Sequence, residues 1–372
     1  MEKYFHPARA DSAPWRAGSK GLRVLMGVDG GDSRGTGLVD LVKALRGSGA
    51  TVGVACLNGH PHRLDSASVG FHPQWPACDR VFLPPPLPPS AAPDRLSDWV
   101  LSVSAAFGPD VVHLADARHA NLPWGAPVLV EADPCLGEGW RWKNEPNEID
   151  PFERRQFAAG LVAADLVVAS TRSGLEELSR FYGPFEATFL IPNGCSPRIR
   201  RARRKTQTIF SVAERGDLES GLWDRIAPHL DWPVSVAGGF DGVVSGPGAG
   251  CVEHLGTLPP AALDARLDAA AIYGAPSRQM PAGDRILQAA SRGCALVLGD
   301  LPGLREHWEG AAVFLPPHEE AAWCGLLQLL IHDENARREL GFRARLRARR
   351  FSARARAKRC LGAYECLLSK VG

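Results

Sequence analysis

The chain has 372 residues, of which 45% are hydrophobic and 23% are charged, with a formal net charge of +2. This length corresponds to about two domains, and the composition is ordinary for a soluble globular protein. The near-neutral charge gives no general drive toward nucleic acid or an anionic membrane. Nine cysteines without a C-x-x-C pair argue against a disulfide framework or a zinc ribbon, and for a reducing cytoplasm.

The sequence contains no recognisable targeting segment and none of the common ligand-binding motifs. The N-terminal sequence has no apolar core of signal-peptide length, and no run approaches the length of a membrane span. No metal-ligand spacing, P-loop or G-x-S-x-G pattern occurs. We therefore expect a cytoplasmic protein without a transmembrane segment, a metal site or a cofactor.

The N-terminal half predicts alternating strands and helices. Residues 1–20 are expected to form a flexible arm. A strand at 22–27, a glycine-rich loop at 28–37, a helix from Leu38 and a strand at 51–57 have the spacing of a βαβ unit. Buried strands are also predicted at 111–114, 128–132 and 166–170, a proline-rich surface loop at 83–93, and a helix at 172–181.

The C-terminal half repeats the alternation. We predict strands at 208–212, 234–238, 270–273, 295–298 and 311–315, and helices from about Ala321 and Ser352. The most informative segment is 276–306. Gly283 and Asp284 stand where a helix begins, and Gly293 closes it. A helix opened by glycine presents free backbone N–H groups, which are a ready site for a phosphate.

This segment resembles the signature region of family 4 glycosyltransferases. The framework positions that carry the resemblance are Pro276, Pro281, Gly283, Leu287, Ala289, Gly293, Asp300, Gly303 and Glu306. The run from Ile191 to Cys195 resembles the interdomain junction of the same family. The resemblance covers about residues 22–370 and implies an α/β fold of GT-B architecture, with two Rossmann-like domains whose parallel sheets face each other across a cleft.

The implied domain organisation has five parts. These are the arm at 1–20, an acceptor-side domain at 21–190, a linker at 191–205, a nucleotide-sugar-side domain at 206–350, and a helix at 351–372 that crosses back to the first domain.

The resemblance also implies site residues. Gly30 and Gly31 match a glycine pair near donor phosphate and acceptor, and Asp133 and His113 match positions that face the sugar. Gly283, Asp284 and Gln288 belong to the donor side, and Arg215 stands one residue from a diphosphate cation. Each has a plainer interpretation: a turn for the glycines, a cap for Asp133, a structural hydrogen bond for His113 and a solvated side chain for Arg215.

The sequence departs from the family pattern at the donor side. Met280 and Gln288 replace the two acids of the signature, and Ala282 replaces its phenylalanine. Glu214 and Ser220 stand where the family has an arginine and a lysine. The charge of Asp284 also lies where a diphosphate would sit, although an amide at Gln288 can still bind a ribose diol.

These observations predict a glycosyltransferase, retaining in outcome, that moves a hexose from a nucleotide-sugar to an unknown acceptor. The pattern of losses supports a second hypothesis, a non-catalytic relative that keeps the fold for binding or scaffolding. A third is a GT-B enzyme with different chemistry on an unusual small acceptor.

Two basic runs stand out. From Arg198 to Lys205 there are six cations in eight residues. This run is either a solvated interdomain segment or a contact for an anionic membrane, an acidic acceptor or a protein partner. The run from Arg343 to Arg350 is expected to be the exposed face of a helix. Neither run is interleaved with aromatic residues, so we do not expect nucleic-acid binding.

Overall fold

A computed structural model describes residues 21–28, 35–57, 78–82, 93–132, 151–196, 205–213, 221–238, 251–278 and 284–371. The chain divides into two compact units. The first contains most of the residues up to Ser196 together with Ala353–Gly372, and the second contains Pro197–Ser352. Within the described residues, no helix is long and apolar enough to cross a membrane.

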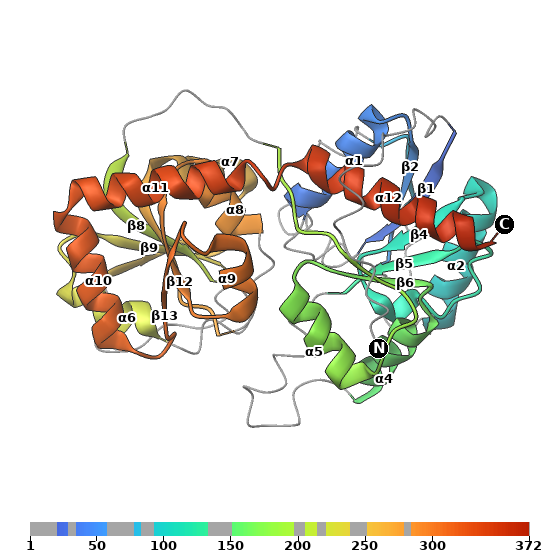
Figure 1. The fold of residues 1–372 in the computed structure, drawn as a ribbon, viewed down its shortest axis with the longest axis horizontal. Coiled ribbons are helices and arrows are strands. Elements are labelled where there is room, and N and C mark those ends of the chain that lie inside the picture. The colour runs from blue at the N-terminus through green and yellow to red at the C-terminus, as the bar shows by residue number, and fades with distance from the viewer. Residues whose placement is uncertain are drawn as a thin grey trace. The chain divides into compact units, whose positions relative to one another are not determined.

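The first unit is built on a seven-stranded parallel sheet (Figure 1). Its strands are β1 (Arg23–Val28), β2 (Thr51–Cys56), β3 (Arg80–Phe82), β4 (Val111–Leu114), β5 (Val128–Glu131), β6 (Leu166–Ala169) and β7 (Thr188–Leu190). They are ordered β3-β2-β1-β4-β5-β6-β7, so the order reverses between β1 and β4. Most of these strands are buried, as short apolar runs of Val, Leu and Ala in a parallel sheet should be.

Helices cover both faces of this sheet. They are α1 (Gly35–Gly47), α2 (Pro93–Phe107), η4 (Ala117–His119), α4 (Pro151–Ala163), α5 (Arg172–Tyr182) and α12 (Ala353–Val371). α1 and α12 share one core with alternate strand residues such as Val24, Met26 and Val111. The intervening residues, such as Leu25 and Val112, pack in a second core with α2, α4 and α5. The period of two along each strand therefore decides which helices each side chain meets.

The second unit has a six-stranded parallel sheet in the order β10-β9-β8-β11-β12-β13. Its strands are β8 (Thr206–Val212), β9 (Val234–Ala237), β10 (Val252–His254), β11 (Ala270–Ala275), β12 (Ala295–Gly299) and β13 (Val313–Leu315). The helices are α6 (Leu222–Ile226), η6 (Ala227–His229), α7 (Pro260–Ala269), α8 (Asp284–Ser291), α9 (Pro302–Trp308), α10 (Glu320–His332) and α11 (Glu334–Ala348).

Tryptophans fill one face of the second sheet. The rings of Trp223 in α6 and Trp323 in α10 meet edge to face, with centroids 6.0 Å apart. A Cβ at Gly274 in β11 would overlap the Trp223 ring, so glycine is required there for this helix to approach the strand. The opposite face packs Phe210 against Tyr273, with ring centroids 6.4 Å apart.

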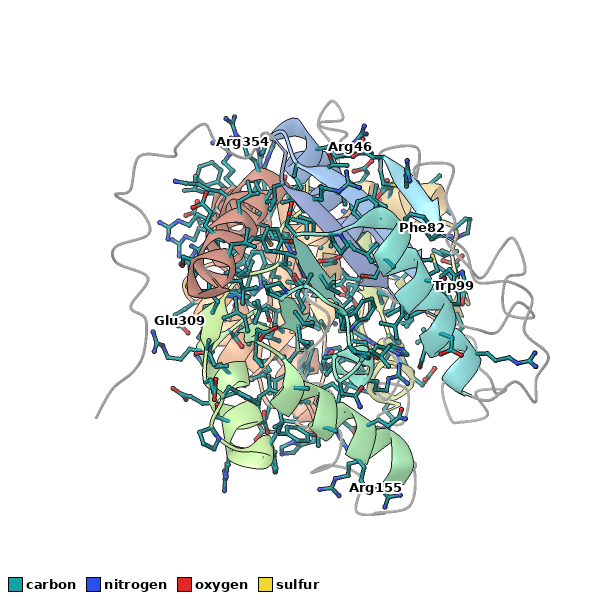
Figure 2. All side chains as sticks on the ribbon, turned by 90° about the vertical axis from the view of Figure 1, so that its right-hand side faces the viewer. Arg46, Phe82, Trp99, Arg155, Glu309 and Arg354 are labelled. Atoms are coloured by element: carbon teal, nitrogen blue, oxygen red, sulfur yellow. The ribbon has the colours of Figure 1, made fainter. Side chains whose placement is uncertain are left out.

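The structure confirms the predicted strands, mostly to within one or two residues. It adds elements that the sequence analysis did not identify: β3, α2, η4, α4, β7, α6, η6, β10, α7 and α9. Phe82 of β3 and Trp99 of α2 are among the residues labelled in Figure 2. The strands that were missed have three residues each, which is too short for an alternation to be visible.

Candidate functional site

Each sheet has one point where the strand order reverses. In the first sheet this point lies between β1 and β4, and in the second it lies between β8 and β11. Open parallel α/β sheets bind their ligands outside the carboxyl ends of the strands at such a point. The expected ligand edge of the second unit is therefore built by the segments that follow β8 and β11.

The helix α8 comes after β11 and begins at Asp284, where the sequence predicted a helix start. Residues 286–290 are all buried, because the helix packs its Ile, Leu and Ala side chains inside the unit. The helix is followed by Gly293, whose φ of +76° lies in the left-handed region. This conformation ends the helix as predicted and needs glycine.

Both predicted donor residues of α8 are buried. Asp284 is 1% exposed and Gln288 is 7% exposed. They lie one turn apart on the helix, so their side chains share a face. A carboxylate and an amide on one face provide hydrogen-bond acceptors and a donor pair, which suit hydroxyl groups better than a bare phosphate.

The C-terminal end of α8 is held by charge. Arg292 donates to Asp264 Oδ1 at 2.6 Å and to Asp268 Oδ1 at 2.9 Å, both in α7. The same guanidinium donates to the backbone carbonyl of Gln288 at 3.0 Å, and the hydroxyl of Ser291 donates to that carbonyl at 2.8 Å. These bonds fix the helix that carries Gln288 against its neighbour.

Close backbone approach shapes the same edge of the sheet. A Cβ at Gly299, the last residue of β12, would overlap the backbone oxygen of Ser277, which follows β11. A Cβ at Gly238, just after β9, would overlap the backbone oxygen of Ala213 at the end of β8. Glycine therefore lets neighbouring strand ends come together at the predicted ligand edge.

In the first unit, the predicted residue His113 lies inside the protein, at 1% exposure. Its Nδ1 is 2.6 Å from the hydroxyl of Tyr364 in α12, and its Nε2 is 3.2 Å from Oε1 of Glu131. Arg356, also in α12, donates to both oxygens of Glu131 at 2.8 and 2.7 Å. Both ring nitrogens of His113 thus face partners of its own unit, which favours the structural interpretation over contact with a sugar.

Burial and charge shift the pKa values of the residues around His113. We call this group the α12 cluster, and it consists of His113, Glu131, Arg356, Cys360 and Tyr364. Burial by itself would raise the pKa of Glu131, but Arg356 and His113 outweigh it and hold that pKa well below its ordinary value. Burial, and next the charge of Glu131, raises the pKa of Cys360 to about 12. Glu131 is therefore ionised and Cys360 is a neutral thiol at physiological pH.

Three members of the cluster could in principle bind a metal. Ligand atoms of His113, Glu131 and Cys360 lie within 4.8 Å of one another. A metal would need a thiolate from Cys360 and a free carboxylate from Glu131. Arg356 already binds both carboxylate oxygens of Glu131. The chemistry of the donors therefore favours a polar link between α12 and the sheet over a metal site.

A polar pair that the sequence analysis missed lies just after β4. Asp116 caps η4 by accepting from the backbone N–H of Arg118 at 2.8 Å, and the Arg118 side chain donates to its other oxygen. Burial would raise the pKa of Asp116, but Arg118 lowers it overall. The signal in the sequence was Asp-x-Arg directly after a buried strand at the point where the order reverses.

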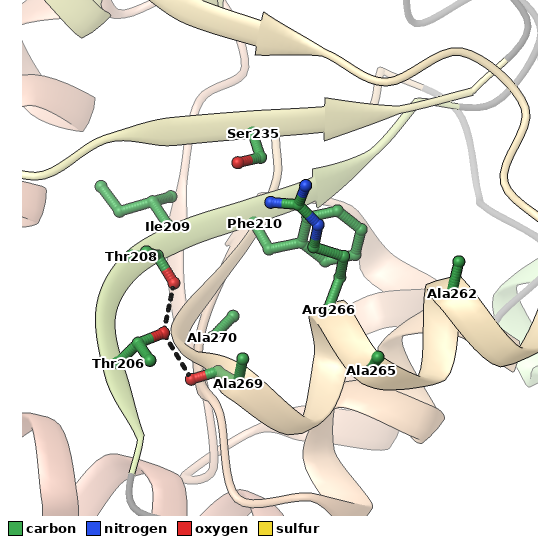
Figure 3. Close-up of a pocket in the computed structure, with 10 residues that line it drawn as sticks. All are labelled: Thr206, Thr208, Ile209, Phe210, Ser235, Ala262, Ala265, Arg266, Ala269 and Ala270. Atoms are coloured by element: carbon green, nitrogen blue, oxygen red, sulfur yellow. Dashed lines mark hydrogen bonds between the residues drawn. The ribbon is translucent and has the colours of Figure 1, made fainter.

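A cavity of about 490 Å³ lies on the second unit, beside α7 (Figure 3). Thr206 and Thr208 at the start of β8 form its hydroxyl side, with Oγ1 atoms 3.0 Å apart. Arg266 and Ser235 line it as well, and both donate to Glu253. Because strand starts form this side, the cavity lies away from the carboxyl ends where a donor is expected.

Five predicted site residues lie outside the described residues: Gly30, Gly31, Asp133, Arg215 and Gly283. Most of the basic run from Arg198 also lies outside them. Its last residue, Lys205, is described, and its ammonium donates to the carbonyl of Leu267 at 3.1 Å. The roles proposed for all of these residues stay predictions.

A protein-family model matches part of the chain. The model described as a glycosyl transferase 4-like domain matches residues 35–194, nearly all of which belong to the first unit. The expected resemblance to family 4 glycosyltransferases is thereby confirmed. No match was found among curated protein sequences.

Solved structures share the fold over nearly the whole chain. A sucrose-phosphate synthase from Thermosynechococcus elongatus has a TM-score of 0.76 at 18% identity, covering 94% of this chain and 100% of that chain. HepE from Anabaena, in complex with UDP and glucose, has a TM-score of 0.70 at 16% identity, covering 93% and 100%. A putative UDP-N-acetylglucosamine 2-epimerase from Listeria monocytogenes has a TM-score of 0.64 at 12% identity, covering 94% and 97%. These similarities confirm the predicted fold class, two Rossmann-like domains of the GT-B type.

Proposed function

We propose that this chain, whose residues 35–194 form a glycosyl transferase 4-like domain on a GT-B fold, transfers a hexose from a nucleotide-sugar to an acceptor. The match of that domain is the observation that carries the proposal. The same fold occurs in a putative epimerase, so the fold alone does not select transfer. The non-catalytic alternative rests on the replaced signature positions alone, of which Gln288 is described, and the family match favours transfer.

The donor is proposed to bind at the carboxyl edge of the second sheet. Backbone N–H groups at the start of α8 would meet the diphosphate, and Arg215, which follows β8 in the sequence, would supply a cation. Gln288 would bind the ribose through its amide. The buried position of Gln288 and the bonds that fix its helix support this role, because a fixed amide loses little entropy on binding.

The acceptor side is proposed to lie at the carboxyl edge of the first sheet. Gly30 and Gly31 follow β1 in the sequence, and β1 borders the point where the strand order reverses. Asp133 follows β5 and would accept hydrogen bonds from sugar hydroxyls. We assign His113 the role of positioning, because its contacts tie β4 and β5 to α12.

The proposed reaction breaks the bond between the anomeric carbon and the diphosphate and forms a bond to an acceptor oxygen with retention of configuration. The acceptor proton leaves with the nucleoside diphosphate. The protein's task is to stabilise charge on the departing diphosphate and to hold the acceptor hydroxyl on the same face of the sugar that the diphosphate leaves. No metal or cofactor is part of this proposal.

Thermal unfolding in the presence of nucleotides tests the proposal. A ligand that binds only the native state raises the midpoint by mass action. UDP and UDP-glucose are the first ligands to try, because HepE was solved with UDP and glucose. GDP, ADP and dTDP and their common sugars complete the series. We expect one nucleotide to raise the midpoint, and its sugar to be transferred or slowly hydrolysed.

Two glutamine variants, one at the proposed site and one away from it, test whether the shift depends on Gln288. Gln288→Ala should weaken the nucleotide-dependent shift, whereas Gln328→Ala should leave it unchanged. Gln328 lies in α10, where its amide donates to the carbonyl of His229 at 3.0 Å. Absence of any shift at millimolar nucleotide would overturn the transferase proposal. Proton NMR of the product's anomeric centre then separates retention from inversion.

A further inference from the structure

The helix α11 turns small residues inward and two large apolar residues outward. Its buried positions are Gly341, Ala344 and Ala348. A Cβ at Gly341 would overlap the backbone oxygen of Gly293, so the helix backbone lies directly on the segment before β12. An ordinary surface helix buries its largest apolar residues and exposes polar ones. In α11 only Leu340 follows this pattern, and the two other large apolar residues are exposed.

The exposed large apolar residues of this helix are Phe342 and Leu346. Phe342 is 62% exposed and Leu346 is 53% exposed. They are four residues apart and therefore lie next to each other on one face of the helix. Packing within the unit does not require them, because the inward face is filled by the small residues and by Leu340, which packs against the core. A pair of exposed large apolar side chains in one place indicates a contact surface.

Arginines lie next to this pair. At 100° per residue, Arg345 is beside Phe342 and Leu346 on the helix. Arg349, which keeps helical dihedral angles at the C-terminal cap, falls on the same side, and Arg350 follows it in the turn beyond the helix. All three arginines are exposed. The sequence from Leu340 to Ser352 contains five arginines and no acidic residue. The nearest acid, Glu339, is bound by Arg343 at 2.7 Å.

We propose that the α11 face, defined as Phe342, Leu346, Arg345, Arg349 and Arg350, binds the surface of an anionic lipid membrane. Arginine guanidinium groups bind lipid phosphates by paired hydrogen bonds, and their apolar stems lie along the acyl boundary. The Phe and Leu side chains enter the headgroup region beside them. Such a helix lies in the plane of the interface and does not span it.

The apolar pair selects this partner over a nucleic acid. A nucleic-acid backbone would neutralise the arginines but would leave Phe342 and Leu346 in water or against phosphate. A bilayer interface satisfies both parts of the face at once. An enzyme held in this way would work on acceptors that are themselves at the membrane surface, which extends the proposed transfer without depending on it.

Flotation of the full chain with lipid vesicles tests the proposal. We expect binding to vesicles of equal parts phosphatidylcholine and phosphatidylglycerol, release in high salt, and no binding to pure phosphatidylcholine. Phe342→Ser combined with Leu346→Ser should lower the partition coefficient by about tenfold or more. Arg345→Gln combined with Arg349→Gln should lower it by about fivefold per arginine.

Matched variants elsewhere control for the loss of apolar area and charge. Leu329→Ser removes a 55% exposed leucine from α10. Arg154→Gln combined with Arg155→Gln removes two exposed cations from α4, with Arg155 labelled in Figure 2. Both controls should bind vesicles like the unchanged protein, and all variants should unfold at the same temperature because every site is on the surface.

Three outcomes would overturn the proposal. They are no binding to the anionic vesicles, equal loss of binding in the controls and the α11 variants, and binding of an RNA oligonucleotide through the α11 face without vesicle binding. Because vesicle binding requires no nucleotide, its failure is distinguishable from failure of the proposed transfer.

Discussion

Helices α12 and α11 are adjacent in the sequence but are attached to their sheets in opposite ways. α12 packs apolar residues against the first sheet and also reaches it through long polar side chains, with Arg356 on Glu131 and Tyr364 on His113. α11 reaches the second unit through the absence of a side chain at Gly341. The buried ion pair of α12 is lost when either partner is replaced, whereas the close approach of α11 is lost when a side chain is added at Gly341. The two attachments should therefore respond to different substitutions.

The largest expected effect comes from the polar attachment. Arg356→Met leaves Glu131 ionised and buried without its main partner, so the first unit should lose about 3–5 kcal/mol of unfolding free energy. Arg46→Met is the matched control, since Arg46 and Asp79 form a half-exposed pair at 2.8 Å whose loss should cost under about 1 kcal/mol. Urea unfolding of both variants measures the difference. Equal costs would show that burial of the ion pair is irrelevant.

Acid should weaken the same attachment. The pKa of Glu131 is held below its ordinary value of 4.5, so its ionised form stabilises the folded state above pH 4.5. This stabilisation is lost as the pH falls below 4.5 toward the folded-state pKa. The stability advantage of the unchanged protein over Glu131→Gln should therefore shrink on acidification, as urea unfolding at a series of pH values would show.

Glu253→Gln is the control for the acid experiment. Arg266 and Ser235 also lower the pKa of Glu253, but its side chain is about half exposed and solvent screens the interaction. The pH dependence of its stability difference should be smaller than that of Glu131. A larger dependence at Glu253 would contradict the account of the α12 cluster.

Two glycine substitutions test the close approach of α11 to its unit. Their expected effects on the free energy of unfolding are smaller and have opposite signs. Gly341→Ala should destabilise the second unit by about 1–3 kcal/mol, because the added Cβ meets the oxygen of Gly293. Gly325→Ala in α10 has open space around it and should stabilise by about 0.5–1 kcal/mol through helix propensity. Calorimetric unfolding of the two variants should shift in opposite directions, and shifts of the same sign would rule this explanation out.

The smallest effect concerns reactivity rather than stability. Iodoacetamide attacks thiolates, and Cys360 has a pKa raised to about 12 by burial and by the charge of Glu131. In mildly alkaline buffer the native protein should react at the exposed Cys251 and not at Cys360. Mass spectrometry after unfolding should find all nine cysteines modified. Rapid native labelling of Cys360 would show that α12 opens readily.

The sequence predicted much of the fold because its signals are local. Buried strands such as β4 and β6 are short Val and Leu runs, and α8 has both a start at Asp284 and a glycine after its end. The missed helices α2 and α4 follow a proline-rich run and a stretch of sequence without a clear hydrophobic period, which hide their starts. Those misses are failures of boundary signals rather than of composition.

The site was less predictable because it depends on contacts between distant residues. His113 and Tyr364 are 251 positions apart, and nothing near His113 in the sequence marks its partner. A weak signal existed in α12, where Arg356 shares a helix face with Cys360, Ala363 and Leu367, which are apolar or nearly so. A charge on an otherwise apolar face predicts a buried counter-charge, which is Glu131.

The C-terminal helix of the first unit is separated from the rest of that unit by the whole of the second. During synthesis, the core that α1 forms with β1, β4 and β5 therefore lacks Tyr364 and Leu367 until α12 has left the ribosome. Nearly all of the second unit is the continuous stretch Pro197–Ser352, which can fold before α12 is made. We expect nascent chains that stop before Ala353 to expose one face of the first sheet to chaperones, so a stop just before α12 should be as damaging to the first unit as one within the second unit.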